Sequence, residues 1–512
     1  MSPPRSRWLT RHIFLDLTPL RRSRDFRALI GGLGVSTFGT QLTAVSVPYQ
    51  VYGLTHSSLY VGLVSLAQLF PLIFGSLFGG SLVDAVDRRR MLLVVEALGA
   101  LSSAGLALNA DFGPVLWPLF LFPAVTAALS GMDSSARNAM VPGMVGLGSV
   151  PAANAMFQAL FQTGGIVGPA LAGLLLAGAG VRAVYWVDVC TYLVALAAVL
   201  AISAQPPLAG AARVRPGWRS TMEGLRFVRR SQPAQGAYLI DLNAMVFGMP
   251  RALFPALAAT VFGGGATTVG LLYAAPGAGA LLGALTSGWV TRVRRQGLAV
   301  ICAVIVWGLA IAGFGVVRFL PLALLLLAVA GLADVVSAVF RNTIIQFAAP
   351  DSMRGRLQGV QMAVVAGGPR LGDLEAGAVA TVFGDTVSVV SGGLACVAGA
   401  LLVARLLPGF RQERSAMGAT GRDVAEAAGE VIGEVEPGGA VDVAEQALPV
   451  TRYPTPRGAA TSVASSSSVN VRPNTSLRAT ANSSSVSVRR FLTWPGVVMV
   501  YILPTRACTW SG

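Results

Sequence analysis

Short patterns from the first half of this chain recur about 204 residues later in the second half. Arg137-Asn138 returns as Arg341-Asn342, and the glycines at 164, 168 and 173 return at 368, 372 and 377. At a slightly larger offset, Val61-Gly62-Leu63 returns as Val269-Gly270-Leu271. Both copies lie in strongly apolar sequence. The repetition therefore predicts a membrane protein that is built from two parallel repeats.

The composition supports a membrane location and excludes several classes of protein. The chain is 54% apolar and 12% charged, whereas soluble domains carry about 25% charged residues. Its net charge of +15 comes from arginines spread over the connections between apolar stretches, which suits an anionic membrane surface better than a nucleic acid. Without any lysine, the chain has neither a P-loop nor a Schiff-base lysine. With two histidines and no CxxC spacing, we expect no metal site and no cofactor.

The apolar stretches are long enough to cross a bilayer core of about 30 Å as helices. Twelve such stretches are present, at residues 26–52, 58–83, 91–109, 114–136, 153–178, 183–203, 236–261, 267–290, 297–316, 319–340, 356–382 and 386–407. We therefore predict an all-α membrane protein with twelve transmembrane helices in two parallel six-helix repeats.

Arginine is distributed unevenly over the connections between these spans. One set of connections carries sixteen arginines, and the alternate set carries only Arg182 and Arg318. Because positively charged loops are retained in the cytoplasm, we expect the first set and both termini to be cytoplasmic. The expected location is the inner (cytoplasmic) membrane of a bacterium, which the chain crosses many times.

The chain is expected to have five segments. Residues 204–235 should contain an amphipathic helix at the inner membrane surface, because Met222, Leu225 and Val228 lie among arginines. Residues beyond about 408 change to acidic and then serine-rich sequence, which predicts disorder. The segments are a cytoplasmic N-terminal segment (1–24), an N-terminal six-helix half (25–203), a cytoplasmic linker (204–235), a C-terminal six-helix half (236–407) and a cytoplasmic tail (408–512).

A recognisable motif, GSLVDAVDRR, follows the second span at residues 80–89. It resembles the loop signature G-x-L-x-D-R-x-G-R-R of the major facilitator superfamily, although Ala85 and Asp87 depart from it. The resemblance implies a cytoplasmic gate made by Gly80, Asp84, Arg88 and Arg89, in which Asp84 pairs with Arg137. The alternative is that these arginines only keep the loop in the cytoplasm.

Span five contains GGIVGPALAG at residues 164–173. Through Gly164, Gly168, Pro169 and Gly173 it resembles the antiporter motif G-x-x-x-G-P-x-x-G-G of the same superfamily, which implies export. Glycines four residues apart also let helices approach closely, so helix packing is the alternative. GGPRLGD at 367–373, Arg137-Asn138 and the Met-Pro-Arg sequence at 249–251 are similar to the enterobactin-exporter-like branch.

Charged residues inside the predicted spans indicate function, because a charge in a bilayer is costly. Arg370, Asp373 and Glu375 fall near the middle of span eleven, Arg251 deep in span seven and Asp334 near the middle of span ten. Arg370 and Asp373 are three residues apart, so they can pair on one helix face. We expect one of the three carboxylates to take up a proton. The alternative is that these residues form structural ion pairs.

Uncharged polar residues form a second predicted lining. Asn154, Gln158 and Gln162 recur every four residues and therefore share one face of span five. Gln41 and Gln68 lie in spans one and two. These side chains could face a cavity and bind polar groups of a substrate, or they could hydrogen-bond between helices.

These features predict a secondary active transporter and not an enzyme. We expect alternating access about a central site, with export of a small organic molecule coupled to proton entry. The resemblance implies a siderophore or a hydrophobic drug as substrate. The expected partners are this small molecule, protons and the lipid bilayer, with no nucleic acid. The alternatives are an importer or uniporter of the same fold, and a non-transporting membrane sensor or scaffold.

Overall fold

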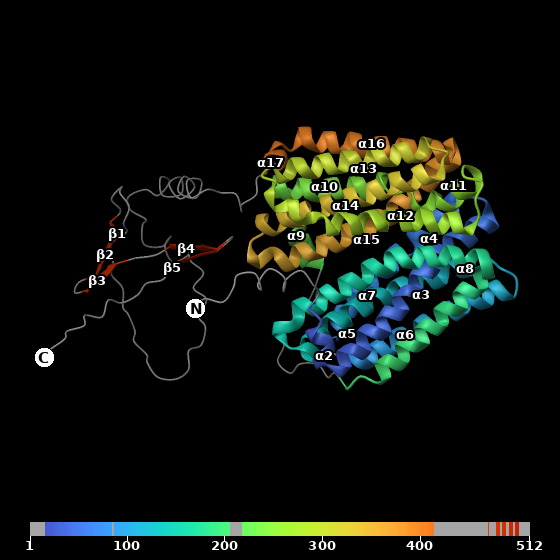
Figure 1. The fold of residues 1–512 in the computed structure, drawn as a ribbon, viewed down its shortest axis with the longest axis horizontal. Helices are drawn as coiled ribbons and strands as arrows, with labels where there is room; N and C mark the ends of the chain where they lie inside the picture. The colour runs from blue at the N-terminus through green and yellow to red at the C-terminus, as the bar shows by residue number, and fades with distance from the viewer. Residues whose placement is uncertain are drawn as a thin grey trace, which may run out of the picture. The chain divides into compact units, whose positions relative to one another are not determined.

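The computed structural model of the protein describes residues 16–83, 86–204, 218–413 and five strand segments between 469 and 500. The chain divides into two units, Met1–Arg414 and Ser415–Gly512. The first unit is helical and holds two bundles (Figure 1). The second unit contains the strands and is described separately below.

The N-terminal bundle is formed by long helices that follow the predicted spans. Ser23 begins α3 as an N-cap, because its hydroxyl accepts a hydrogen bond from the amide of Phe26 at 3.1 Å. The elements are α2 (Thr18–Arg22), α3 (Arg24–Thr55), α4 (Ser58–Ala67), α5 (Leu69–Val83), α6 (Arg88–Asp111), α7 (Trp117–Val145), η1 (Leu147–Ser149) and α8 (Val150–Leu200).

The C-terminal bundle repeats this order after the linker helix α9 (Trp218–Arg230). Val228 of α9 is buried with Leu357 and Val360, whereas Leu225, Arg226 and Arg229 are exposed. The amphipathic helix at the membrane surface stays a prediction. The elements of the bundle are α10 (Gln232–Phe247), η2 (Arg251–Leu253), α11 (Phe254–Thr260), α12 (Ala266–Leu285), η3 (Ser287–Arg292), α13 (Gln296–Val316), α14 (Leu320–Ala348), α15 (Asp351–Phe383), α16 (Asp385–Leu406) and α17 (Pro408–Gln412).

The described helices account for all twelve predicted spans. Ten segments are long and apolar enough to cross a membrane. One of them, α8, holds two spans, because it bends at Gly180, where φ is +78°. The twelfth span is α15, whose internal charges keep it outside those ten. The prediction of an all-α membrane protein with twelve helices in two six-helix repeats is thus confirmed.

Glycine contacts repeat between the two bundles. Gly131 of α7 lies so close to the backbone of α5 that a Cβ would overlap Ser76. In the second bundle, Gly331 of α14 lies in the same way against the backbone of α12 at Pro276. Small residues permit this close helix packing in membranes, so corresponding helix pairs pack alike in the two repeats.

The ordered bundle continues beyond the predicted boundary at residue 407. Phe410 of α17 is fully buried against Gly236 and Gly297. In the second unit, β1 (Val469–Asn470), β2 (Arg478–Ala481) and β3 (Ser484–Ser487) form an antiparallel sheet, and β4 (Phe491–Trp494) pairs with β5 (Val497–Val500). Residues 408–412 thus form a helix, and the predicted disorder of the tail as a whole stays a prediction. The rest of the tail lies outside the described residues.

Candidate functional site

A cavity of about 570 Å³ lies between the two bundles, halfway along the helices. Helices α3, α4, α7 and α8 line it from one side, and η2, α12, α13, α14 and α15 line it from the other. Its lining combines charged, amide and aromatic side chains. These side chains include Gln41, Gln68, Phe161, Gln162, Arg251, Tyr273, Trp307, Asp334, Arg370 and Asp373.

The two bundles meet most closely at one end of the helices. This distal end carries the helix termini near residues 55–58, 260–266 and 383–385; the opposite, linker end carries the termini near 83–88, 200 and 232. At the distal end, Gly377 lies against the backbone of Ser58, and Gly173 lies against Gly270. The Ser58 hydroxyl also donates a hydrogen bond to Asp385 across the interface, at 2.8 Å. We call these contacts the distal seal.

Arg251 reaches the cavity from a break in span seven. The helix ends at Phe247, and helical structure resumes at η2. Backbone carbonyls in this break, which have no partner within the helix, accept hydrogen bonds from side chains instead. The Trp307 indole N–H donates to the carbonyl of Gly248 at 2.8 Å, and the Tyr273 hydroxyl donates to that of Arg251 at 3.0 Å. The Arg251 side chain is exposed in the cavity, as expected from its sequence position.

Asp373 of α15 connects the two bundles beside the cavity. Its Oδ2 accepts a hydrogen bond from the hydroxyl of Ser65 on α4 at 2.7 Å. Its Oδ1 accepts one from the backbone amide of Ala252 in η2 at 3.1 Å. Gly62 lies one turn before Ser65 and against the backbone of Asp373. Because Gly62 has no side chain, α4 and α15 come close enough for the Ser65 hydroxyl to reach the Asp373 carboxylate. One carboxylate therefore bridges both halves.

Arg370 and Asp373 both line the cavity, but they do not form the ion pair that their spacing predicts. Arg370 instead donates from Nη1 to the carbonyl of Ala366 at 2.7 Å, and its buried Nε has no hydrogen-bond partner among the described residues. Glu375 is half-buried and lies outside the cavity lining. Only two of the three predicted carboxylates, Asp373 and Asp334, therefore reach the cavity.

Asp334 belongs to a buried ion cluster in the second bundle. Arg341 lies 2.8 Å from Asp241 and 4.0 Å from Asp334. Its Nη1 also donates to the hydroxyl of Ser337 at 2.8 Å. The side chain of Asp334 is 27% exposed, whereas those of Asp241 and Arg341 are almost fully buried. Asp334 is thus the member of this cluster that faces the cavity.

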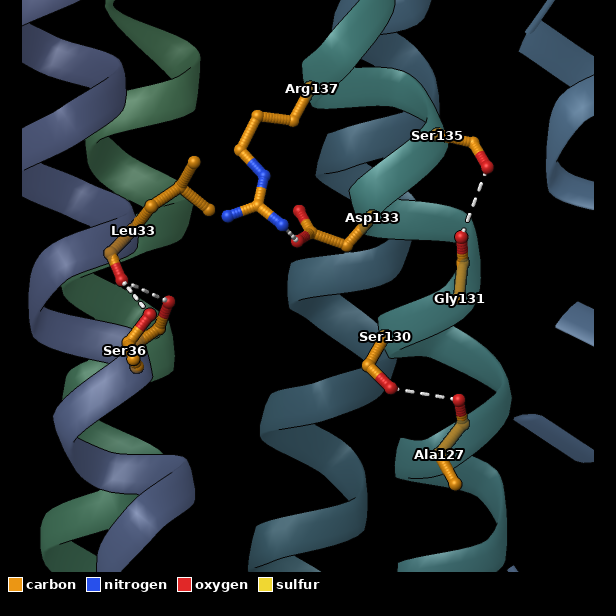
Figure 2. Close-up of polar contacts among 9 residues, drawn as sticks. Leu33, Ser36, Ala127, Ser130, Gly131, Asp133, Ser135 and Arg137 are labelled. Carbon is orange, nitrogen blue, oxygen red and sulfur yellow. Dashed lines mark hydrogen bonds and ion pairs between the residues drawn. The ribbon is translucent and has the colours of Figure 1, made fainter. Parts of the chain in front are cut away.

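Arg137 of the predicted gate forms an ion pair within its own helix, α7. Its Nη2 lies 3.2 Å from Oδ2 of Asp133, one turn earlier on α7, and Figure 2 shows the pair on α7, to the right of the helix that carries Leu33. The predicted partner Asp84 lies outside the described residues. Arg88 is buried, and Arg89 donates to the carbonyl of Leu200 at 2.6 Å, so Arg89 holds the start of α6 against the end of α8. The spacing of Asp133 and Arg137 could have indicated this pair.

The antiporter-like motif packs helices in this structure. Gly168 lies against Gln41 of α3, and Gly164 lies against Thr37 of the same helix. Gly173 contributes to the distal seal, and Pro169 lines the cavity. Of the polar stripe on α8, Gln162 lines the cavity together with Gln41 and Gln68, whereas Asn154 and Gln158 are exposed and lie outside the lining.

Comparison with known proteins identifies the family. The transmembrane secretion effector family matches residues 15–427. The chain belongs to this family. Among curated relatives of this secretion-effector chain, the enterobactin exporter of Citrobacter koseri is 29% identical over 411 residues, which are 80% of this chain and 97% of that protein. An enterobactin exporter of Escherichia coli is 30% identical over 402 residues, covering 78% of this chain and 96% of that protein.

Solved structures show the same fold at low sequence identity. A bacterial homologue of the human lysosomal transporter Spinster, crystallised inward-facing and unoccupied, gives a TM-score of 0.60 at 15% identity and covers 76% of this chain and 98% of that one. The nucleoside transporter NupG gives 0.58 at 13% identity, with 76% and 98% covered. This secretion-effector chain is therefore a major facilitator transporter and not an enzyme.

Proposed function

We propose that this transporter exports a small organic molecule across a bacterial inner membrane in exchange for protons. The curated relatives are enterobactin exporters that align over nearly their whole length. The observation that carries the proposal is the position of Asp373, a carboxylate beside the central cavity that bonds to both halves. Charged residues at this depth in a membrane mark substrate or proton pathways.

The proposed orientation places both termini and the linker in the cytoplasm. The linker end carries nearly all the arginines of the connections, which supports this orientation through the positive-inside rule. The distal seal would then lie on the outer side of the membrane, and substrate would enter the cavity from the cytoplasm. This is the arrangement in which an exporter receives its substrate.

Asp373 offers a physical basis for coupling. In its ionised form, the carboxylate accepts the hydrogen bonds from Ser65 and Ala252 and holds the halves together next to the distal seal. An empty transporter would therefore stay closed at its distal end. Binding a proton, or a substrate that competes for these bonds, removes this restraint. Strict exchange needs such a restraint, because an empty carrier that opened freely would dissipate the gradient.

The cavity lining suits an organic molecule with oxygen acceptors and an apolar or aromatic part. Arg251, Gln41 and Gln162 supply hydrogen-bond donors. Trp307, Tyr273 and Phe161 supply aromatic surface. Siderophores and hydrophobic drugs both fit this description, and siderophores also match the names of the curated relatives.

The proposal is tested with purified transporter in sealed vesicles carrying an imposed pH gradient. A panel of siderophores and hydrophobic dyes is presented on the side of the linker end. At least one compound should accumulate when the opposite compartment is acidic, and accumulation should stop when an ionophore removes the gradient. Accumulation that persists without a gradient would contradict proton coupling, and movement only toward the linker side would contradict export.

A further inference from the structure

A second group of charged side chains lies inside the N-terminal bundle. Helix α6 packs against α7 and α8, and Glu96 of α6 is only 2% exposed. The charged or titratable groups that act on it from these helices are Asp133 and Arg137 of α7 and Asp188 of α8. Tyr192 of α8 interacts electrostatically with all three acids. Three carboxyl groups thus share one guanidinium in a largely buried space.

The three acids differ in their partners. Asp188 accepts hydrogen bonds from the hydroxyls of Thr43 and Ser103, both at 2.7 Å. Asp133 forms the ion pair with Arg137 (Figure 2). Glu96 has neither kind of partner: its Oε2 is buried and has no hydrogen bond within the described part of the chain. A negative charge on Glu96 would therefore be compensated only by Arg137, which already pairs with Asp133.

Burial and like charges both act against an ionised Glu96. A carboxylate without hydrogen-bond donors loses its hydration and gains nothing in return. Two neighbouring carboxylates, with only one arginine between them, add repulsion. The carboxyl group avoids both penalties when it binds a proton, because the neutral acid carries no charge.

Polar groups of α3, α6 and α8 lie between Glu96 and the cavity. Glu96, Gly99 and Ser103 share one face of α6. Gly99 leaves space for the ring of Tyr192, which a Cβ at this position would overlap. The Tyr192 hydroxyl lies 3.2 Å from that of Thr40, and Thr40, Thr43 and Asp188 all line the cavity. Hydroxyl and carboxyl groups therefore lie between the cavity and the face of α6 that carries Glu96.

We propose that Glu96 is a proton-binding site of the N-terminal half, connected to the cavity through Asp188 and Tyr192. It is distinct from Asp373 and Asp334, which face the cavity from the C-terminal half. The role of Glu96 in coupling rests on the proposed proton-driven export. The binding of an exchangeable proton by Glu96 does not rest on it.

The occupancy is tested by infrared spectroscopy of the whole transporter in lipid at neutral pH. Protonated carboxyl groups give a C=O stretching band that ionised groups lack. Glu96→Gln should remove one protonated carboxyl from this band, and the same component should shift in deuterated buffer. Asp111→Asn is the matched control, because Asp111, unlike Glu96, has an ion-pair partner, Arg182, at 3.2 Å. This variant should leave the band unchanged.

A second measurement uses unmodified protein, in case Glu96→Gln fails to fold. A hydrophobic carbodiimide adds to protonated carboxyl groups, and peptide mass spectrometry should find the adduct on Glu96 and not on Asp111. An unchanged infrared band in a folded Glu96→Gln variant, or an unlabelled Glu96, would overturn the proposal. Neither readout requires transport, so a failure here is distinguishable from a failure of the proposed export.

Discussion

At the scale of residues, the decisive feature is that Asp373 divides its two carboxylate oxygens between the two halves. Ser65 belongs to the N-terminal bundle and Ala252 to the C-terminal bundle. Asp373 could be singled out from the sequence, because a charged residue within an apolar span is rare. The sequence could not show that Ser65 is the partner, because a serine in an apolar helix is common and the contact joins residues far apart in the chain.

The first prediction concerns this carboxylate. Asp373→Asn keeps the shape of the side chain but cannot exchange a proton. Transport driven by a pH gradient should be lost, while substrate binding remains measurable by calorimetry or quenching of tryptophan fluorescence. Glu375→Gln is the control, since Glu375 lies outside the cavity lining, and it should transport normally. Full gradient-driven transport by the Asp373→Asn variant would show that the proton binds elsewhere.

The second prediction concerns the buried arginine of the C-terminal half. Arg341→Ala leaves Asp241 buried without a counter-ion, which should destabilise the protein by about 3–5 kcal/mol. Arg182→Ala removes an arginine that is 68% exposed and pairs with Asp111, and it should change stability by about 0–1 kcal/mol. Unfolding in detergent, followed by tryptophan fluorescence, compares the two. Equal effects would mean that the buried cluster is not a structural ion pair.

At the scale of helices, hydropathy is enough to find the spans but not their interruptions. Twelve apolar stretches gave twelve spans, because a bilayer requires about 20 apolar residues for each helix. The bend at Gly180 and the break before Arg251 depend on local dihedral angles and on tertiary donors such as Trp307. Glycine occurs throughout these helices, so its presence alone does not mark a bend.

The third prediction tests the close approach of α4 and α15. A side chain at Gly62 would overlap the backbone of Asp373 and Leu374. Gly62→Val should therefore weaken the distal seal and open the cavity to the distal side. The control is Gly53→Val, because Gly53 has no atom near the position of a new Cβ.

The opening is measured with Ala44→Cys, a cavity-lining position, in a chain whose native cysteines are replaced by serine. An impermeant thiol reagent on the distal side should label it in the Gly62→Val background and not in the Gly53→Val background. Equal labelling of the two would show that Gly62 does not contribute to the seal.

At the scale of the whole molecule, the repeat in the sequence correctly indicated two halves, and a cavity lies between them. The residues that line this cavity could be predicted from the sequence only in part. On span five, Gln162 lines the cavity, whereas Gln158 of the same predicted stripe lies outside it. A helical stripe predicts which residues share a face, and only packing decides where that face is turned.

The fourth prediction concerns orientation. Arginine enrichment predicts that the linker end lies in the cytoplasm. His56→Cys and Gly265→Cys, at the distal end, should therefore react with an impermeant reagent added outside intact cells, and Pro216→Cys in the linker should react only after the cells are broken. The reverse pattern would invert the orientation and with it the proposed direction of transport.

The most direct test of the account is to follow protons and substrate together. Vesicles are prepared with the linker end outside, an acidic interior and a pH-sensitive dye inside, and a transported compound from the panel is added outside. Entry of the compound should be accompanied by a rise of the interior pH, and Asp373→Asn should abolish this rise. Uptake without a change of interior pH, or protons moving in the same direction as the compound, would contradict proton-coupled export.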